Sequence, residues 1–385
     1  MAEYLFPGVY VEEIVGGVHP IEGVDTSTGV MVGVTELGPN ALVKIKSFAE
    51  FTRKFGGPVV PAPDVCDKWT LDQQEGGHWW QFPLAVKGFF ENGGQHLVIQ
   101  RIPRDHPDEL SVDDFVTAIQ SLKEVDSPLC LAPGMWSAKI QKTLIEHCEA
   151  RQNCFAILDP PPGLDLNGVL TFRRRINSSF AALYYPWLEV AGLNGQTTEI
   201  APSGHLAGIY ARVDGQRGVH AAPANEVIHG ITKIAREVTT HDQESLNPAG
   251  INALRSFPGQ GHRVWGARTL SRDPEWKYVN VRRLLTFLEE SIRKGTQWVV
   301  FEPNGEPLWA RVRQAVTNFL RTVWLAGALQ GRTAEEAFFV KCDRTTMTQA
   351  DIDQGRLIYL IGVAPIKPAE FVIFRIGQWT ANYKD

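Results

Sequence analysis

The chain has 385 residues, 44% of them hydrophobic and 21% charged, which is an ordinary globular composition and enough length for two or three domains. Its formal net charge of −5 argues against a protein whose main function is to bind nucleic-acid phosphates. No stretch approaches the ~18 consecutive apolar residues that span a bilayer, and the chain begins without a signal-peptide pattern, so we expect cytoplasmic synthesis and no membrane insertion.

The first residues have the pattern of an extended arm. "FPGVYVEEI" at 6–14 predicts a short strand after a Pro-Gly turn, with Val9, Val11 and Ile14 among its apolar side chains. The stretch at 15–24 is rich in Gly and is typical of a linker. We therefore expect this segment to reach away from the domain that follows it.

From residue 28 onward, apolar strands alternate with helices. Strands are expected at 28–36, 96–102, 128–133, 154–161 and 181–190. Helices are expected at 47–57, 82–94, 113–124, 137–151 and 171–180. Strands such as "FAIL" are continuously apolar, as burial on both faces requires. This order predicts βα units and a mainly parallel sheet with helices on both faces.

Two helix starts fit the capping-box pattern, in which an N-cap hydroxyl and an acidic residue three positions later satisfy each other's backbone. They are Ser111 with Asp114, and Thr333 with Glu336.

The remaining chain has a different order of elements. A short helix followed by a loop is expected at 202–223, and a strand near 262–269. An amphipathic helix is expected at 278–295, with its leucines on one face and its arginines on another. Further expectations are a helix at 308–331 and strands at 298–303, 335–343, 356–365 and 369–379.

The last of these strands, "FVIFRIGQW", is apolar on both faces although it lies at a chain end. Its large apolar residues are Phe371, Ile373, Phe374, Ile376 and Trp379. A free strand edge attracts another chain. Backbone hydrogen bonds gain ~0.5–1.5 kcal/mol each, which ordering costs of ~1–2 kcal/mol per residue roughly cancel. Burial of the apolar side chains, at ~1.5–3 kcal/mol each, must therefore carry such a link.

No catalytic, cofactor or metal motif survives inspection. The Gly-rich loop at 258–263 lacks the Lys-Ser/Thr of a phosphate loop. The histidines lack the close spacing of zinc ligands, and 348–355 lacks the final Glu of a calcium loop. Ser203-Gly204-His205 lacks the GxSxG context of a hydrolase. The five cysteines include no CxxC pair and are expected to be buried free thiols.

Long stretches of the sequence resemble contractile tail sheath proteins. They include "FPGVYVEEI", "LYYPWLEV", "PSGHLAGIYARVDGQRGVHAAPAN", "VRRLLTFLEESIRKGTQWVVFEP" and "LIYLIGVAPIKPAEFVIFRIGQW". The resemblance covers essentially the whole chain. The family includes the sheaths of contractile phage tails, R-type pyocins and phage-tail-like contractile injection systems.

The resemblance implies a fold and a domain plan. The fold is α/β: a subtilisin-like α/β sheath domain without protease activity, an α+β C-terminal domain, and extended β-strand arms at both ends. The corresponding ranges are 1–24 for the N-terminal arm, 25–265 for the sheath domain, 266–369 for the C-terminal domain and 370–385 for the C-terminal strand.

The resemblance also implies a function and partners. The arms would link copies of the chain into a helical tube of stacked hexameric rings around an inner tube, which contraction drives through a target envelope. The partners would be other copies, the inner-tube protein, and baseplate and tail-terminator or cap proteins, with no nucleic acid and no cofactor. The protein would be a non-enzymatic part of a phage-tail-like particle.

Basic side chains on the C-terminal helices are candidates for contact with the inner tube. They are Arg282, Arg283, Arg293, Lys294, Arg311 and Arg313. A solvated helix face explains them equally well. Two alternative functions also stay open: a hydrolase-like enzyme using Ser203, His205 or His229, and an oligomeric scaffold that does not contract.

Overall fold

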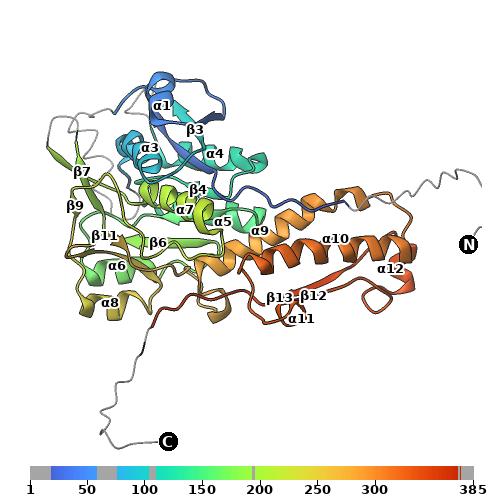
Figure 1. Cartoon of the computed structure of the whole chain (residues 1–385). Coiled ribbons are helices and arrows are strands. Elements are labelled where there is room, and N and C mark those ends of the chain that lie inside the picture. Colours follow the sequence, from blue (N-terminus) through green and yellow to red (C-terminus); the bar gives the residue numbers. More distant parts are fainter. Residues whose placement is uncertain (1–18, 59–75, 104–109, 193–195, 372, 374–385) are drawn as a thin grey trace, which may run out of the picture. The chain divides into compact units, whose positions relative to one another are not determined.

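The computed structural model describes residues 19–58, 76–103, 110–192, 196–371 and 373 (Figure 1). The chain divides into two compact units. The large unit comprises Val24–Leu288 and Pro365–Asp385, and the small unit comprises Met1–Gly23 and Glu289–Ala364. The division falls inside a helix, because 266–288 pack with the large unit. The predicted domain boundary after residue 265 stays a prediction.

An eight-stranded sheet forms the centre of the large unit, within the described residues. Its order is β11–β10–β6–β5–β4–β1–β3–β2. The pairs from β10 to β3 are parallel, and β11 and β2 join the edges antiparallel. The bounds are β1 (Gly29–Thr35), β2 (Val43–Ile45), β3 (Leu97–Pro103), β4 (Leu129–Leu131), β5 (Phe155–Leu158), β6 (Ala181–Tyr185), β10 (Ile251–Phe257) and β11 (Gly261–Val264). The predicted, mainly parallel sheet is confirmed.

Two hydrophobic clusters cover the two faces of this sheet. Along β1, Val30, Val32 and Val34 belong to one cluster, whereas Met31 belongs to the other. Such alternation is what a strand buried on both faces requires. The first cluster includes side chains of α4 (Val112–Gln120), α5 (Ala138–Arg151), α6 (Leu166–Arg173) and α8 (Thr240–Leu246). The second includes side chains of α1 (Phe48–Phe55), α3 (Phe82–Glu91) and α7 (Ser203–Arg217).

The other elements of the large unit are shorter. A three-stranded sheet has the order β8–β7–β9, and the remaining pieces are single 3₁₀ turns. The bounds are β7 (Leu188–Ala191), β8 (Thr197–Ile200), β9 (Lys233–Ile234), η1 (Trp79–Gln81), η2 (Ser121–Glu124) and η3 (Pro274–Trp276).

Several predicted boundaries in the large unit were wrong. The strand expected at 181–190 is two strands in different sheets, separated at Pro186, which has no backbone N–H for a ladder. The helix expected at 171–180 is α6, which begins after Asp165, whose carboxylate accepts a hydrogen bond from the Gly168 backbone (2.7 Å). The sequence reading also missed β10, whose apolar residues follow a turn rich in Asn, Pro and Gly.

The small unit contains the end of α9 (Val279–Gly295), which runs on from the large unit, and a long helix, α10 (Glu306–Leu325). Its remaining elements are η4 (Gln297–Val299), α11 (Ala334–Ala337), β12 (Phe338–Lys341), α12 (Gln349–Asp353) and β13 (Leu360–Val363). The strand predicted at 298–303 was wrong. Val300 and Phe301 are exposed in a turn, and Phe301 has a left-handed φ of 70°, so this apolar run marks no buried strand.

One of the two predicted capping boxes forms. The Ser111 backbone N and hydroxyl both donate to the Asp114 carboxylate, at 2.8 and 2.9 Å. The box predicted for Thr333 and Glu336 was wrong, because the Glu336 carboxylate accepts a hydrogen bond from the backbone N of Arg332 instead (2.7 Å).

Candidate inter-subunit surface

Most of the predicted arm residues lie outside the described part of the chain. These are Val9, Val11, Ile14, Phe374, Ile376 and Trp379. Phe371 and Ile373 are described; they belong to no strand, and they are 72% and 83% exposed. Two large apolar side chains thus face solvent in the single chain. Their burial against another copy stays a prediction.

The C-terminal segment is anchored immediately before these exposed residues. Arg268 donates two hydrogen bonds to Glu370, from Nε to Oε1 (2.7 Å) and from Nη2 to Oε2 (2.5 Å). The Lys277 Nζ lies 3.4 Å from the same carboxylate, and the Tyr278 hydroxyl donates to it at 3.1 Å. Arg268 is itself fixed by donating to the Asn247 carbonyl (2.7 Å). The chain at Glu370 is therefore held at a defined point of the large unit.

Electrostatics favours the ionised form of Glu370. Burial alone would raise its pKa, but the hydrogen bonds and positive charge of Arg268, with the charge of Lys277, outweigh burial. The pKa of Glu370 therefore lies below its ordinary value, and the contact is an ion pair at neutral pH.

A two-stranded sheet of the small unit has open edges. β12 and β13 pair antiparallel, with Phe338 opposite Val363 and Lys341 opposite Leu360. Within the described residues each strand has a single neighbour, so one backbone edge of each is unpaired. Phe339 and Leu360 are 47% and 53% exposed. Such a sheet is marginal alone and well suited to accept further strands.

One face of this sheet is supported from within the unit. Phe338 is buried, and β12 contacts α10. Arg313 of α10 donates a hydrogen bond to the carbonyl of Cys342, directly after β12. The predicted contact of Arg313 with an inner tube thus competes with this structural role.

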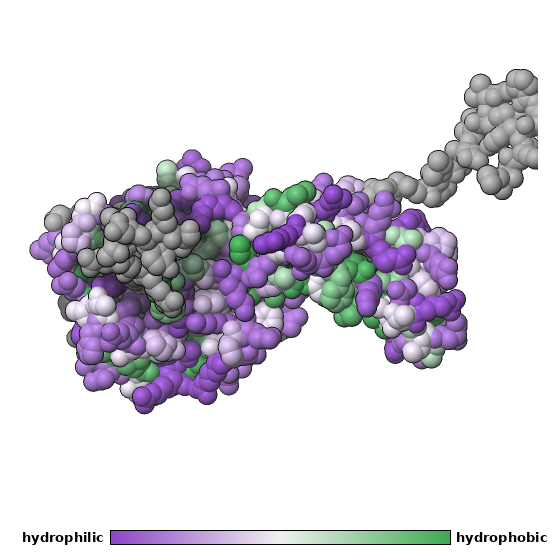
Figure 2. Space-filling model, turned by 60° about the horizontal axis from the view of Figure 1, so that its bottom comes forward, coloured by the Kyte–Doolittle hydropathy of each residue, from purple (hydrophilic) through white to green (hydrophobic). Residues whose placement is uncertain are grey.

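Figure 2 shows hydrophobic patches on an otherwise mostly hydrophilic surface.

Two arginines predicted to contact an inner tube are buried inside the large unit. Arg283 donates to both carboxylate oxygens of Asp214, at 2.9 and 2.6 Å, and the two side chains are 4% and 2% exposed. The Arg282 guanidinium lies 4.3 Å from the ring centre of Trp276 and 4.6 Å from that of Phe180. The first turns of α9 therefore do not have the exposed basic face that the sequence suggested, and we withdraw Arg282 and Arg283 as contact residues.

The other predicted basic residues lie nearer the surface. Arg293 and Lys294 both pair with Glu290, at 2.7 and 3.3 Å. Arg311 pairs with Glu302 at 2.8 Å. The side chains of Arg293, Lys294 and Arg311 are 59%, 39% and 33% exposed, although that of Glu290 is only 11% exposed, so these basic groups reach the surface from partly buried pairs.

The residues of the hydrolase alternative are not arranged for catalysis. The Ser203 hydroxyl donates to Asp159 (2.6 Å) rather than to a histidine, and burial raises the pKa of Asp159 to about 6. His205 is two positions along the same helix, where side chains do not face each other. Burial lowers the pKa of His205 to about 4. His229 uses its backbone to bind Asn92.

The described residues contain neither a metal-binding cluster nor a membrane-spanning helix. No three His, Cys, Asp or Glu side chains there are grouped closely enough to hold a metal ion. Of the described helices, none combines the length and apolarity that crossing a bilayer requires. Cys130, Cys148, Cys154 and Cys342 are free and buried, as predicted, and Cys66 lies outside the described residues.

Comparison with known proteins decides the family. The family model of the phage tail sheath protein central domain matches residues 109–270, and that of the phage tail sheath C-terminal domain matches residues 271–378. The PVC sheath complex of an extracellular contractile injection system, solved in the contracted state, contains a chain 30% identical to this one. The match covers 98% of this chain and 99% of that chain, with a TM-score of 0.78.

The chain belongs to the phage tail sheath family. Similar sheath chains occur in the anti-feeding prophage (AFP). One is in its contracted helical sheath (30% identity, 98% and 100% coverage, TM-score 0.77), and another is in its six-fold symmetrised baseplate (31%, 98% and 100%, 0.73). This tail sheath protein is also 26% identical over 267 residues to a putative prophage major tail sheath protein of Pseudomonas aeruginosa, covering 67% of each. In five phage tail sheath proteins the match spans only 26–50% of the relative.

The anchor of the C-terminal segment was missed by sequence reasoning. Arg268 and Glu370 are 102 positions apart and belong to no motif. A lone Glu before an apolar stretch of sequence gives no signal of its partner, so only the fold reveals it.

Proposed function

We propose that this chain is the structural subunit of a contractile sheath. Copies of it assemble as stacked hexameric rings into a helical tube around an inner tube, and contraction drives that tube through a target envelope. Family membership supports this, together with the near-complete coverage of PVC and AFP sheath chains. Contraction is a switch between two packings of rigid units and needs no nucleotide.

The observation that carries this proposal is the open β12–β13 sheet. Its two strands lack neighbours at one edge each among the described residues, and Phe339 and Leu360 of the same sheet expose apolar side chains. The terminal strands of other copies, 9–14 and 370–378, would complete it by β-augmentation. The free energy gained from backbone hydrogen bonds roughly cancels the entropy cost of ordering the strands. Burial of the apolar side chains of the arms therefore supplies the affinity.

The large unit would serve as the rigid body of the ring. We assign it the subtilisin-like sheath fold, on the strength of its parallel sheet covered on both faces. We also assign it no enzymatic role. The support is the environment of Ser203, whose hydroxyl is committed to a buried carboxylate.

The remaining partners follow from the same assembly. The inner tube would meet exposed basic side chains of the small unit, with Arg293, Lys294 and Arg311 as the remaining candidates, because polar contacts release more readily than a large apolar seal. Baseplate and terminator or cap proteins would meet the ends of the stack. The complete particle would be a phage tail or a phage-tail-like injection device.

Electron microscopy and activity assays separate the alternatives. We expect the purified chain, or the chain expressed with its inner-tube protein, to form tubes in a long, thin state and in a short, wide state, without esterase or protease activity. Tubes in a single state would favour the non-contracting scaffold. Hydrolysis that is lost in Ser203→Ala would favour the enzyme.

The inner-tube contact has its own test. Arg311→Glu should weaken assembly on the inner tube, whereas Arg53→Glu, on an exposed helix of the large unit, should not. Equal assembly of both variants would remove Arg311 from the proposal.

A further inference from the structure

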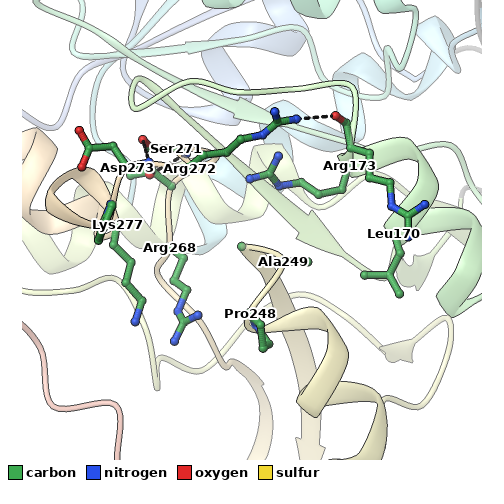
Figure 3. A pocket seen from close by; sticks show the side chains of 13 residues that line it. Leu170, Arg173, Pro248, Ala249, Arg268, Ser271, Arg272, Asp273 and Lys277 are labelled. Atoms are coloured by element: carbon green, nitrogen blue, oxygen red, sulfur yellow. Dashed lines mark hydrogen bonds between the residues drawn. The ribbon is translucent and has the colours of Figure 1, made fainter.

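A basic cavity of about 520 Å³ lies in the large unit (Figure 3). Its walls come from the end of α6, the loop before β10 and the segment that leads to α9. Six of the thirteen lining residues are charged, and all of these but Asp273 are basic: Arg173, Arg174, Arg268, Arg272 and Lys277. Side chains from separate segments therefore bring positive charge to one hollow.

Only part of this charge is neutralised within the chain. Arg268 and Lys277 pair with Glu370. For Arg173, Arg174 and Arg272, no carboxylate of the described residues lies within ion-pair distance. Arg272 donates to the carbonyl of Arg174 at 3.0 Å, the bond drawn in Figure 3. A carbonyl is a neutral acceptor, so it leaves the positive charge uncompensated.

Arg173 is the most confined member of the set. It is 7% exposed; its guanidinium donates to the carbonyl of Leu270 (2.9 Å) and to that of Ile176, while its Nε has no hydrogen-bond partner among the described residues. Burial and the positive charge of Arg272 lower the pKa of Arg173 to about 10. A buried charge without a counter-ion is costly, so an anion entering the cavity would relieve an existing penalty.

The end of a helix explains only part of this arrangement. Basic residues in the last turn of α6 interact favourably with its carbonyl end. This explains why Arg173 and Arg174 lie there. It does not account for Arg272 and Lys277, which arrive from a different segment. Guanidinium groups match the oxygens of carboxylate or phosphate, and several line this one cavity.

We propose that this cavity, which we call the α6 pocket, binds an oxyanion. Two sources share this chemistry: a carboxylate side chain of a second copy, which rests on the proposed function, and free inorganic phosphate. The chain carries a net charge of −5, so other copies offer a surplus of carboxylates.

The first arm of the test uses inorganic phosphate and the purified chain. Thermal unfolding is measured in phosphate and in chloride at matched ionic strength. If phosphate is the ligand, it raises the unfolding midpoint by a few degrees relative to chloride. Arg272→Glu, which places a carboxylate at the pocket, abolishes this shift. The matched control Arg53→Glu, an exposed residue on α1 with the same change of charge, retains it.

The second arm measures sheath assembly by sedimentation and electron microscopy. If the ligand is a carboxylate of another copy, Arg272→Glu assembles poorly, Arg53→Glu assembles as the parent does, and both stay folded. A phosphate shift without an assembly defect assigns the pocket to the free anion. If Arg272→Glu neither loses the phosphate-induced shift nor assembles poorly, the proposal is wrong. If the parent chain itself forms no sheath, the proposed function fails. The phosphate experiment alone then decides whether the α6 pocket binds an oxyanion.

Discussion

Arg268 and Glu370 form a two-bonded ion pair across 102 positions of sequence, at 2.7 and 2.5 Å. The pair fixes the C-terminal segment to the large unit immediately before Phe371 and Ile373, which face solvent. If this segment links two copies, as proposed, it transmits force only when its start is held in place. The Arg268–Glu370 contact would hold it.

Loss of the Glu370 carboxylate should loosen the C-terminal segment and destabilise the large unit. Glu370→Ala leaves Arg268 largely buried without its counter-ion, which costs about 1–3 kcal/mol. Urea unfolding of the purified chain measures this change. Glu275→Ala, an exposed acidic residue of η3, is the control and should change stability little. Equal stability of the two variants would show that the Arg268–Glu370 pair does not stabilise the large unit.

Acid should weaken the same contact. The pKa of Glu370 is lowered in the folded chain from 4.5, so its stabilising contribution is fully present above that value. The contribution is lost as pH falls below 4.5 and through the lower folded pKa. The difference in unfolding free energy between the parent and Glu370→Gln should therefore be constant near neutral pH and shrink in acid. A difference that grows as pH falls would contradict this assignment.

The buried pair of Arg283 and Asp214 should matter far more than an exposed one. Asp214→Asn leaves a nearly inaccessible guanidinium without its charge partner, at a cost of about 3–5 kcal/mol. Glu302→Gln breaks the half-exposed pair with Arg311 and should cost less than about 1 kcal/mol. Thermal or urea unfolding compares the two. Similarly small losses of unfolding free energy in both variants would mean that the Arg283–Asp214 pair is not a buried structural contact.

Charge placed beside the open sheet should block assembly without unfolding the chain. Leu360 is exposed on β13, so Leu360→Lys should leave the unfolding midpoint near that of the parent. It should raise the concentration needed for assembly about tenfold or more, because an arm loses apolar contact there. Leu42→Lys, an exposed leucine of the large unit, provides the control. Unchanged assembly by Leu360→Lys would exclude this part of the sheet as a docking surface.

Sequence patterns predicted the parts of this fold that local physics controls. The continuous apolar run of β5 and the capping box at Ser111 are set by a few neighbouring residues, and both were located correctly. The apolar run at 298–303 was misread because apolarity alone does not say whether a segment finds a sheet neighbour.

The charged residues show the same limit more sharply. Arg282 and Arg283 lie outside the leucine face of the predicted helix, yet Phe180, which packs on Arg282, and Asp214, which pairs with Arg283, come from distant segments. The α6 pocket likewise gathers residues that are far apart in sequence. Where partners are distant, only the folded chain identifies them.

Cryo-electron microscopy of the polymer formed by the full chain tests the central claim most directly. We predict that the unpaired edges of β12 and β13 carry strands 9–14 and 370–378 contributed by other copies, with Phe371 and Ile373 buried at the junction. A polymer in which both edges stay unpaired, or in which each copy folds its own arms back onto them, would contradict the account.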